Sequence, residues 1–164
     1  MKKKLLTTFL LTCAITIYAQ DQTTFILVRH AEKANDGTDN PPLTEAGLQR
    51  ANDLAALLTN QEIDALYSTP FIRTETTLTP IGRDKGMEVK NYDPFAGAKW
   101  LSGALKKHAG GTIVICGHSN TIPELANALL GKERFQQFDD NDYSNLIIIV
   151  TSEVGKGKLV RLKF

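Results

Sequence analysis

The sequence has little cysteine, no large excess of charge of either sign and no apolar run long enough for a transmembrane helix. Its 164 residues include 19 Lys and Arg against 18 Asp and Glu, which gives a formal net charge of +1. Proteins that bind nucleic acid concentrate positive charge on one face, so this balance argues against a nucleic-acid partner. The length suffices for one hydrophobic core and is short for two, so a single globular domain is expected.

The first 19 residues have the pattern of a secretory signal peptide. Lys2, Lys3 and Lys4 precede an apolar stretch from Leu5 to Tyr18, and the small residue Ala19 provides a cleavage site. This stretch is shorter than the roughly 20 residues of a membrane-spanning helix, which argues against stable membrane insertion. The pattern predicts a periplasmic or secreted protein.

Removal of this leader would leave a mature domain of residues 20–164 with a formal net charge of −2, because its three lysines would be lost without any acid. An anionic ligand would then have to be held by locally placed cations. Lipid attachment at Cys13 is disfavoured, because Thr12 stands where a small residue is wanted. Cys116 would be the only cysteine of the mature domain, so no internal disulfide could form and the fold would depend on its core.

Short apolar, β-branched runs alternate with stretches of helical period along the mature domain. The predicted strands are 25–28, 66–68, 88–91, 113–116, 146–150 and 158–164, and the predicted helices are about 44–58, 73–85, 100–107 and 121–130. Such alternation is typical of a mostly parallel sheet covered on both faces by helices. We therefore expect an α/β fold, a three-layer α/β/α sandwich with a doubly wound sheet and a hairpin formed by the last two strands.

Two helix starts carry capping signals. Thr44 is a candidate N-cap for the first helix, and Thr121 with Glu124 fits a capping box for the last.

Histidines follow the two most apolar strands. Arg29 and His30 come after the first of them, and Gly117 and His118 come after the other. Ligands of open α/β sheets bind at the carboxyl ends of strands, so both histidines could face one crevice. Arg73, in the first turn of a helix that follows a third strand, adds a cation there. Two arginines and two histidines predict a site for a dianion such as a phosphoryl group.

Four ordered motifs resemble the signatures of the histidine phosphatase superfamily, which has the phosphoglycerate-mutase-like fold. They are Leu27-Val28-Arg29-His30-Ala31, Leu43-Thr44-Glu45-Ala46-Gly47, Ser68 with Arg73 and Thr77, and Gly117-His118. The resemblance covers about residues 23–164. The sequence departs from it at Ala31, where glycine usually follows the nucleophile, and at Leu78, where alanine often stands.

The resemblance implies a metal-independent phosphatase without a cofactor, in which His30 is the nucleophile and forms a phosphohistidine. A neutral imidazole is a good nucleophile near neutral pH. Arg29, Arg73 and His118 would bind the phosphoryl group and stabilise its charge in the transition state. Ser119 and Asn120 would either line the phosphate pocket or satisfy amides at the start of the last helix. The implied substrate is a phosphorylated small molecule or a phosphoprotein.

The proton donor for the leaving group is less clearly marked. Asp93 lies where one branch of the superfamily keeps its acid, and it is equally suited to forming a turn before Pro94. Glu124 and Glu32 are the alternatives, although Glu124 is explained more simply by the capping box.

Three other functions compete with a phosphomonoesterase. A phosphate- or phosphoprotein-binding module could keep the arginines and histidines and lack an effective acid. A phosphomutase needs a second held phosphate and usually more inserted chain over the site. A metal hydrolase is disfavoured, because His30, His108 and His118 lack dedicated spacing and the neighbouring arginines would repel a cation.

Overall fold

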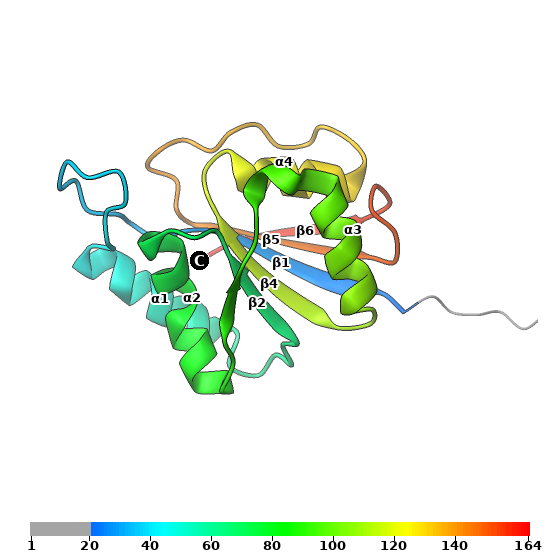
Figure 1. Ribbon diagram of the computed structural model, residues 1–164, viewed down its shortest axis with the longest axis horizontal. Coiled ribbons are helices and arrows are strands. Elements are labelled where there is room, and N and C mark those ends of the chain that lie inside the picture. Colours follow the sequence, from blue (N-terminus) through cyan, green and yellow to red (C-terminus); the bar gives the residue numbers. More distant parts are fainter. Residues whose placement is uncertain (1–20) are drawn as a thin grey trace, which may run out of the picture.

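A computed structural model describes residues 21–164 (Figure 1). The signal peptide predicted for residues 1–19 lies outside the described residues. The strands are β1 (Thr23–Arg29), β2 (Ala65–Ser68), β3 (Val89–Asn91), β4 (Thr112–Gly117), β5 (Asn145–Thr151) and β6 (Lys158–Lys163). The helices are α1 (Glu45–Leu57), α2 (Ile72–Lys85), α3 (Gly97–Lys107), α4 (Thr121–Leu130) and a short 3-10 helix, η1 (Pro94–Ala96). Between residues 21 and 164, no helix is long and apolar enough to cross a membrane.

The six strands form one sheet in the order β3-β2-β4-β1-β5-β6. The first four strands of that order are parallel, and β5 and β6 run antiparallel as the predicted hairpin. Buried β-branched and leucine side chains fill β1 and β4, as expected for central strands covered on both faces. The mostly parallel sheet expected from the sequence is confirmed.

The core has two parts because successive side chains of a strand point to opposite faces of the sheet. Phe25 and Leu27 of β1 pack in the cluster that includes residues of α3 and α4. Ile26 and Val28 pack in the cluster that includes residues of α1 and α2. Figure 1 shows the two helix pairs on opposite sides of the sheet, which confirms the predicted three layers.

Some helix boundaries differ from those predicted. Thr44 is the N-cap of α1, as expected, because its hydroxyl accepts a hydrogen bond from Gly47 N. α3 begins at Gly97 instead of Trp100, because η1 leads directly into it.

The capping box predicted for α4 is wrong. The helix begins at Thr121 itself, and its N-cap residue, Asn120, makes no side-chain cap hydrogen bond. The Thr121 hydroxyl instead accepts a hydrogen bond from His118 N at 2.9 Å. Thr121 therefore supports the turn that carries His118.

Candidate active site

The register of the sheet brings the two histidine motifs together. Arg29, the last residue of β1, is paired with Gly117, the last residue of β4. His30 N then donates a hydrogen bond to Gly117 O at 2.9 Å. The ring centroids of His30 and His118 lie 5.5 Å apart. Both histidines thus face one site at the carboxyl edge of the parallel strands, as the sequence predicted.

His30 is held as a neutral imidazole, and one of its ring nitrogens has no hydrogen-bond partner among residues 21–164. Its side chain is buried, and Nδ1 lies 2.8 Å from the carbonyl oxygen of Ala31. A carbonyl can only accept a hydrogen bond, so Nδ1 carries the proton and Nε2 keeps its lone pair. Burial, with the charges of Arg29 and Arg73, lowers the pKa of His30 from 6.5 to about 3, although the hydrogen bond to Ala31 opposes this shift. An imidazole in this state keeps at neutral pH the lone pair that a nucleophile needs.

A chain of hydroxyl groups fixes the tautomer of His118. Its Nε2 atom lies 2.9 Å from Thr69 Oγ1, and that hydroxyl donates its only proton to Thr74 Oγ1. Thr69 must therefore accept from the Nε2–H of His118. Burial lowers the pKa of His118 to about 4, and the charges of Arg73 and Arg29 contribute. Phe71 packs edge-on against the ring, with centroids 5.0 Å apart.

Both arginines keep a buried donor without a partner. Within residues 21–164, Arg29 Nε and Arg73 Nε are buried and have no hydrogen-bond acceptor. Arg73 also lies with its guanidinium 4.5 Å from the Phe71 ring centroid, and burial and the charge of Arg29 lower its pKa. An unsatisfied buried donor is costly and is typical of a functional site. Donors of this kind beside two neutral histidines suit an oxyanion.

Thr77 joins the loop after His30 to the helix that carries Arg73. Its hydroxyl accepts a hydrogen bond from Ala31 N at 3.0 Å and donates one to the Arg73 carbonyl at 2.7 Å. Among the described residues, every residue with positive φ is a glycine, so alanine at position 31 imposes no left-handed backbone.

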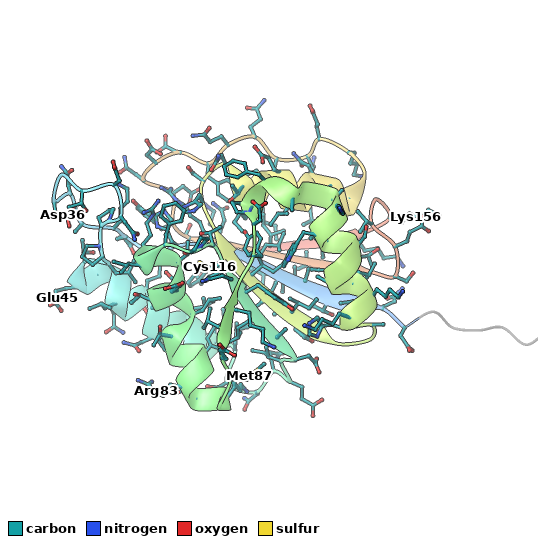
Figure 2. The ribbon with its side chains drawn as sticks, in the orientation of Figure 1. Asp36, Glu45, Arg83, Met87, Cys116 and Lys156 are labelled. Carbon is teal, nitrogen blue, oxygen red and sulfur yellow. The ribbon has the colours of Figure 1, made fainter. Side chains whose placement is uncertain are left out.

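The motif at residues 43–47 supports the same loop from the other side. Thr44 N donates to Glu32 O at 2.9 Å, and Leu43 forms a β-bridge with Lys33. A Cβ atom at Gly47 would overlap Glu32 O, so glycine allows α1 to approach this backbone closely. The loop that continues through Asp36 projects away from the body of the molecule (Figure 2).

The sequence model of the histidine phosphatase superfamily (branch 1) matches residues 25–96, which contain three of the four motifs. Over these residues the chain is similar to the histidine phosphatase superfamily. A sequence relative, phosphoserine phosphatase 1 of Hydrogenobacter thermophilus, is 38% identical over 74 residues, or 42% of this chain. That match spans 35% of the relative's own length.

Solved structures of two phosphatases have the same fold. The protein histidine phosphatase SixA complexed with tungstate superposes with a TM-score of 0.70 at 19% identity, over 85% of this chain and 96% of SixA. Phosphoserine phosphatase from Entamoeba histolytica in complex with 3-phosphoglyceric acid gives 0.70 at 19% identity, over 87% and 97% of the two chains. At these identities the likeness establishes the fold.

The three acids considered as proton donors have different surroundings. Asp93 is exposed after β3, and its carboxylate accepts a hydrogen bond from Phe95 N at the start of η1. Arg50 binds both carboxylate oxygens of Glu32 and lowers its pKa, although burial alone would raise it. Glu124 is exposed in the first turn of α4. Of the three acids, Glu32 therefore has the strongest structural contact, its ion pair with Arg50.

The remaining predicted residues lie in the turn between β4 and α4. Ser119 is half-buried, and its carbonyl accepts a hydrogen bond from Phe138 N. Asn120 is exposed, and its carbonyl accepts from Glu124 N at 3.2 Å. Cys116, labelled in Figure 2, is buried at the end of β4, where burial raises the pKa of its thiol. Residues 21–164 contain no group of three His, Cys, Asp or Glu side chains that could hold a metal ion.

Sequence reasoning missed Tyr143 and Thr69. The Tyr143 ring centroid lies 4.2 Å from Arg29 Cζ and 6.1 Å from the His30 ring centroid. Tyr143 lies just before β5, and because β5 is antiparallel to β1 its amino end lies at the site edge of the sheet. A polar segment that precedes an antiparallel strand was the signal that could have identified it.

Proposed function

We propose that the protein is a phosphomonoester hydrolase that transfers the phosphoryl group to His30 Nε2. The observation that carries the proposal is the pairing of a neutral, buried imidazole with two buried arginine Nε donors that have no acceptor within residues 21–164. A phosphoryl dianion supplies both an electrophilic phosphorus and the oxygens that such donors bind.

The reaction has two transfers. In the first, the lone pair of His30 Nε2 forms a bond to phosphorus, the bond from phosphorus to the ester oxygen breaks, and that oxygen takes a proton from an acid. In the second, water attacks the phosphohistidine, releases inorganic phosphate and restores His30. Arg29 and Arg73 stabilise the charge of both transition states, where one preorganised donor is commonly worth ~10²–10³ in rate. His118 joins them in its protonated form, because a bound dianion raises the pKa of the neighbouring imidazole and lets Nδ1 carry a second proton. No step in this scheme needs a metal ion.

Asp93 is the proposed proton donor, and Ser119 and Asn120 are proposed to border the bound phosphoryl group. Asp93 follows β3, so it lies at the same edge of the sheet as both histidines, and its exposed carboxylate is accessible to a leaving group. Glu32 is the weaker candidate, because its ion pair with Arg50 favours the ionised form. The leader at residues 1–19 supports action in the periplasm or outside the cell.

Trapping of the phosphorylated enzyme tests the proposal. The purified protein is mixed with a ³²P-labelled aryl phosphate in excess chelator and quenched within one turnover. We expect label that survives alkali and is lost in acid, as a phosphoramidate is, and none in His30→Ala. Chelator-sensitive turnover, or equal labelling of His30→Ala, would contradict the proposal.

Asp93→Asn tests the proton donor separately. Asparagine keeps the N-cap of η1, so the variant removes the acid and spares the local structure. We expect turnover of an alkyl phosphate to fall by ~10²-fold or more and that of an aryl phosphate, whose leaving group needs no proton, to change little. Equal losses on both substrates would assign Asp93 a structural role.

A phosphate-binding module with weak or no catalysis is the second candidate. It is favoured by the other roles of the candidate acids, since Asp93 caps η1 and Glu32 binds Arg50. A folded protein that binds inorganic phosphate and yields no phosphorylated enzyme would support this candidate.

A further inference from the structure

The segment that precedes β5 surrounds the Arg29 side chain. Arg29 Nη1 donates hydrogen bonds to the carbonyl oxygens of Asp139 at 2.9 Å and Asp142 at 3.3 Å. The Tyr143 ring lies 4.2 Å from Arg29 Cζ, and Asp140 Oδ1 lies 4.0 Å from Nη2. Arg29 thus reaches more than 100 residues along the chain for its partners.

These contacts use one edge of the guanidinium and leave another edge free. Both protons of Nη1 are directed to carbonyl groups, whereas Nε is buried without an acceptor among residues 21–164. The Nε and Nη2 donors lie side by side in the guanidinium plane and match two oxygens of a phosphoryl group. The Asp140 side chain near Nη2 is 88% exposed, so it can move aside for an anion.

The same segment is anchored to the last strand. Both Asp142 carboxylate oxygens accept hydrogen bonds from Lys163 Nζ at 3.0 Å, and Oδ1 also accepts from Ser144 Oγ at 3.0 Å. Burial alone would raise the pKa of Asp142, but hydrogen bonds from Asn145, Lys163 and Ser144 outweigh it and lower the pKa below its ordinary range. The anchor therefore stays ionised at neutral pH.

We infer that Tyr143 is a positioning residue for phosphoryl binding, whose ring fixes the Arg29 guanidinium with its Nε and Nη2 edge toward the substrate. The attraction between a guanidinium and an aromatic face needs the ring and not the hydroxyl. A half-buried ring beside both Arg29 and His30 also excludes water from one side of the site. This inference rests on the proposed function.

Binding of inorganic phosphate, measured by calorimetry, tests the inference without requiring turnover. Tyr143→Phe keeps the ring and should bind phosphate with wild-type affinity. Tyr143→Leu should raise the Kd about three- to tenfold, the range that corresponds to a cation–π contact at a partly exposed site. Phe95→Leu removes a 91% exposed aromatic side chain after β3 and should leave the Kd unchanged.

A second pair of variants tests the anchor if Tyr143→Leu does not fold. Lys163→Ala and Lys156→Ala each remove an exposed lysine from an ion pair, with Asp142 and Glu153 respectively. Only Lys163→Ala should weaken phosphate binding, by about two- to threefold, because surface pairs contribute little.

Two results would overturn the inference. If Tyr143→Leu binds phosphate with wild-type affinity, Tyr143 has no positioning role. If that variant does not fold, wild-type affinity in Lys163→Ala leads to the same conclusion. Equal weakening in Tyr143→Phe and Tyr143→Leu would assign the effect to the hydroxyl. Failure of the wild-type protein to bind phosphate would instead contradict the proposed function.

Discussion

The two ends of the parallel strands carry similar polar residue types, but these residues differ in whether their hydrogen-bonding groups have partners within the protein. At the amino end, His108 Nε2 lies 3.0 Å from the Tyr67 hydroxyl, and the His108 carbonyl accepts a hydrogen bond from Thr23. Asp64 accepts a hydrogen bond from Thr112 N at 2.7 Å. The polar groups of this end hold loops together.

At the carboxyl end, His30 is buried with a free Nε2, and Arg29 and Arg73 keep donors unpaired within the described chain. The two ends differ in how many side-chain donors and acceptors find a hydrogen-bond partner within the protein. A histidine or an arginine is a candidate for chemistry where folding has removed it from water and left some of its hydrogen bonds unmade.

The largest effect should separate the histidines of the two ends. His30→Ala should lower aryl phosphate turnover by at least ~10³-fold, because the nucleophile is lost. His108→Ala, the same change at the amino end, should keep turnover within about twofold of wild type. Steady-state kinetics of both variants decide this, and comparable losses would erase the functional distinction between the ends.

Two arginines of one helix give the next comparison. Arg73→Ala should lower kcat/KM by ~10²–10³-fold, since it removes a donor aimed at developing charge. Arg83, near the other end of α2, is paired with Asp84 and its side chain is 69% exposed. Arg83→Ala should leave kcat/KM unchanged within error, and a loss equal to that of Arg73→Ala would point to damage to α2.

Stability should fall as pH is lowered from 7 to 5. The folded-state pKa values of His30 and His118 are about 3 and about 4, both below the 6.5 of an ordinary histidine. The unfolded chain therefore takes up protons first, so the stability present above pH 6.5 is lost as pH falls toward 4. We expect a loss of about 2 to 3 kcal/mol by urea unfolding.

His30→Asn serves as the control for this pH dependence, because asparagine does not titrate. Its loss of stability between pH 7 and 5 should be about half that of the wild type, as one of the two shifted groups is gone. An unchanged pH dependence would show that His30 is not buried as a neutral group.

Two helical glycines give the smallest effects, of opposite sign. Gly47→Ala should destabilise the protein by about 1–3 kcal/mol, because the new Cβ meets the Glu32 carbonyl below the site. Gly103→Ala in α3 meets nothing within 4 Å and should stabilise by about 0.5–1 kcal/mol through helix propensity. Guanidinium unfolding checks both, and a stabilising Gly47→Ala would contradict the close approach of α1.

The sequence predicted the fold well where periodicity is strong. The apolar runs at 25–28 and 113–116 marked β1 and β4 correctly. The predicted helix ends at residues 85 and 130 also agree with α2 and α4, each of which is followed by a glycine in the αL conformation. It was less accurate where one side chain had two possible partners. Thr121 has the right spacing for a capping box, but its hydroxyl bonds to His118 N instead. A local pattern cannot show which of two nearby donors the tertiary fold will place within reach.

The sequence by itself determined the alternation of strands and helices and the place of Arg29, His30, Arg73 and His118 at strand or helix ends, because these follow from local periodicity and from the order of the motifs. Only the tertiary structure decided the charge state of the histidines, since burial and neighbouring cations set their pKa values. It also decided the partners of Arg29, which come from a segment more than 100 residues away and arrive only when β5 pairs with β1.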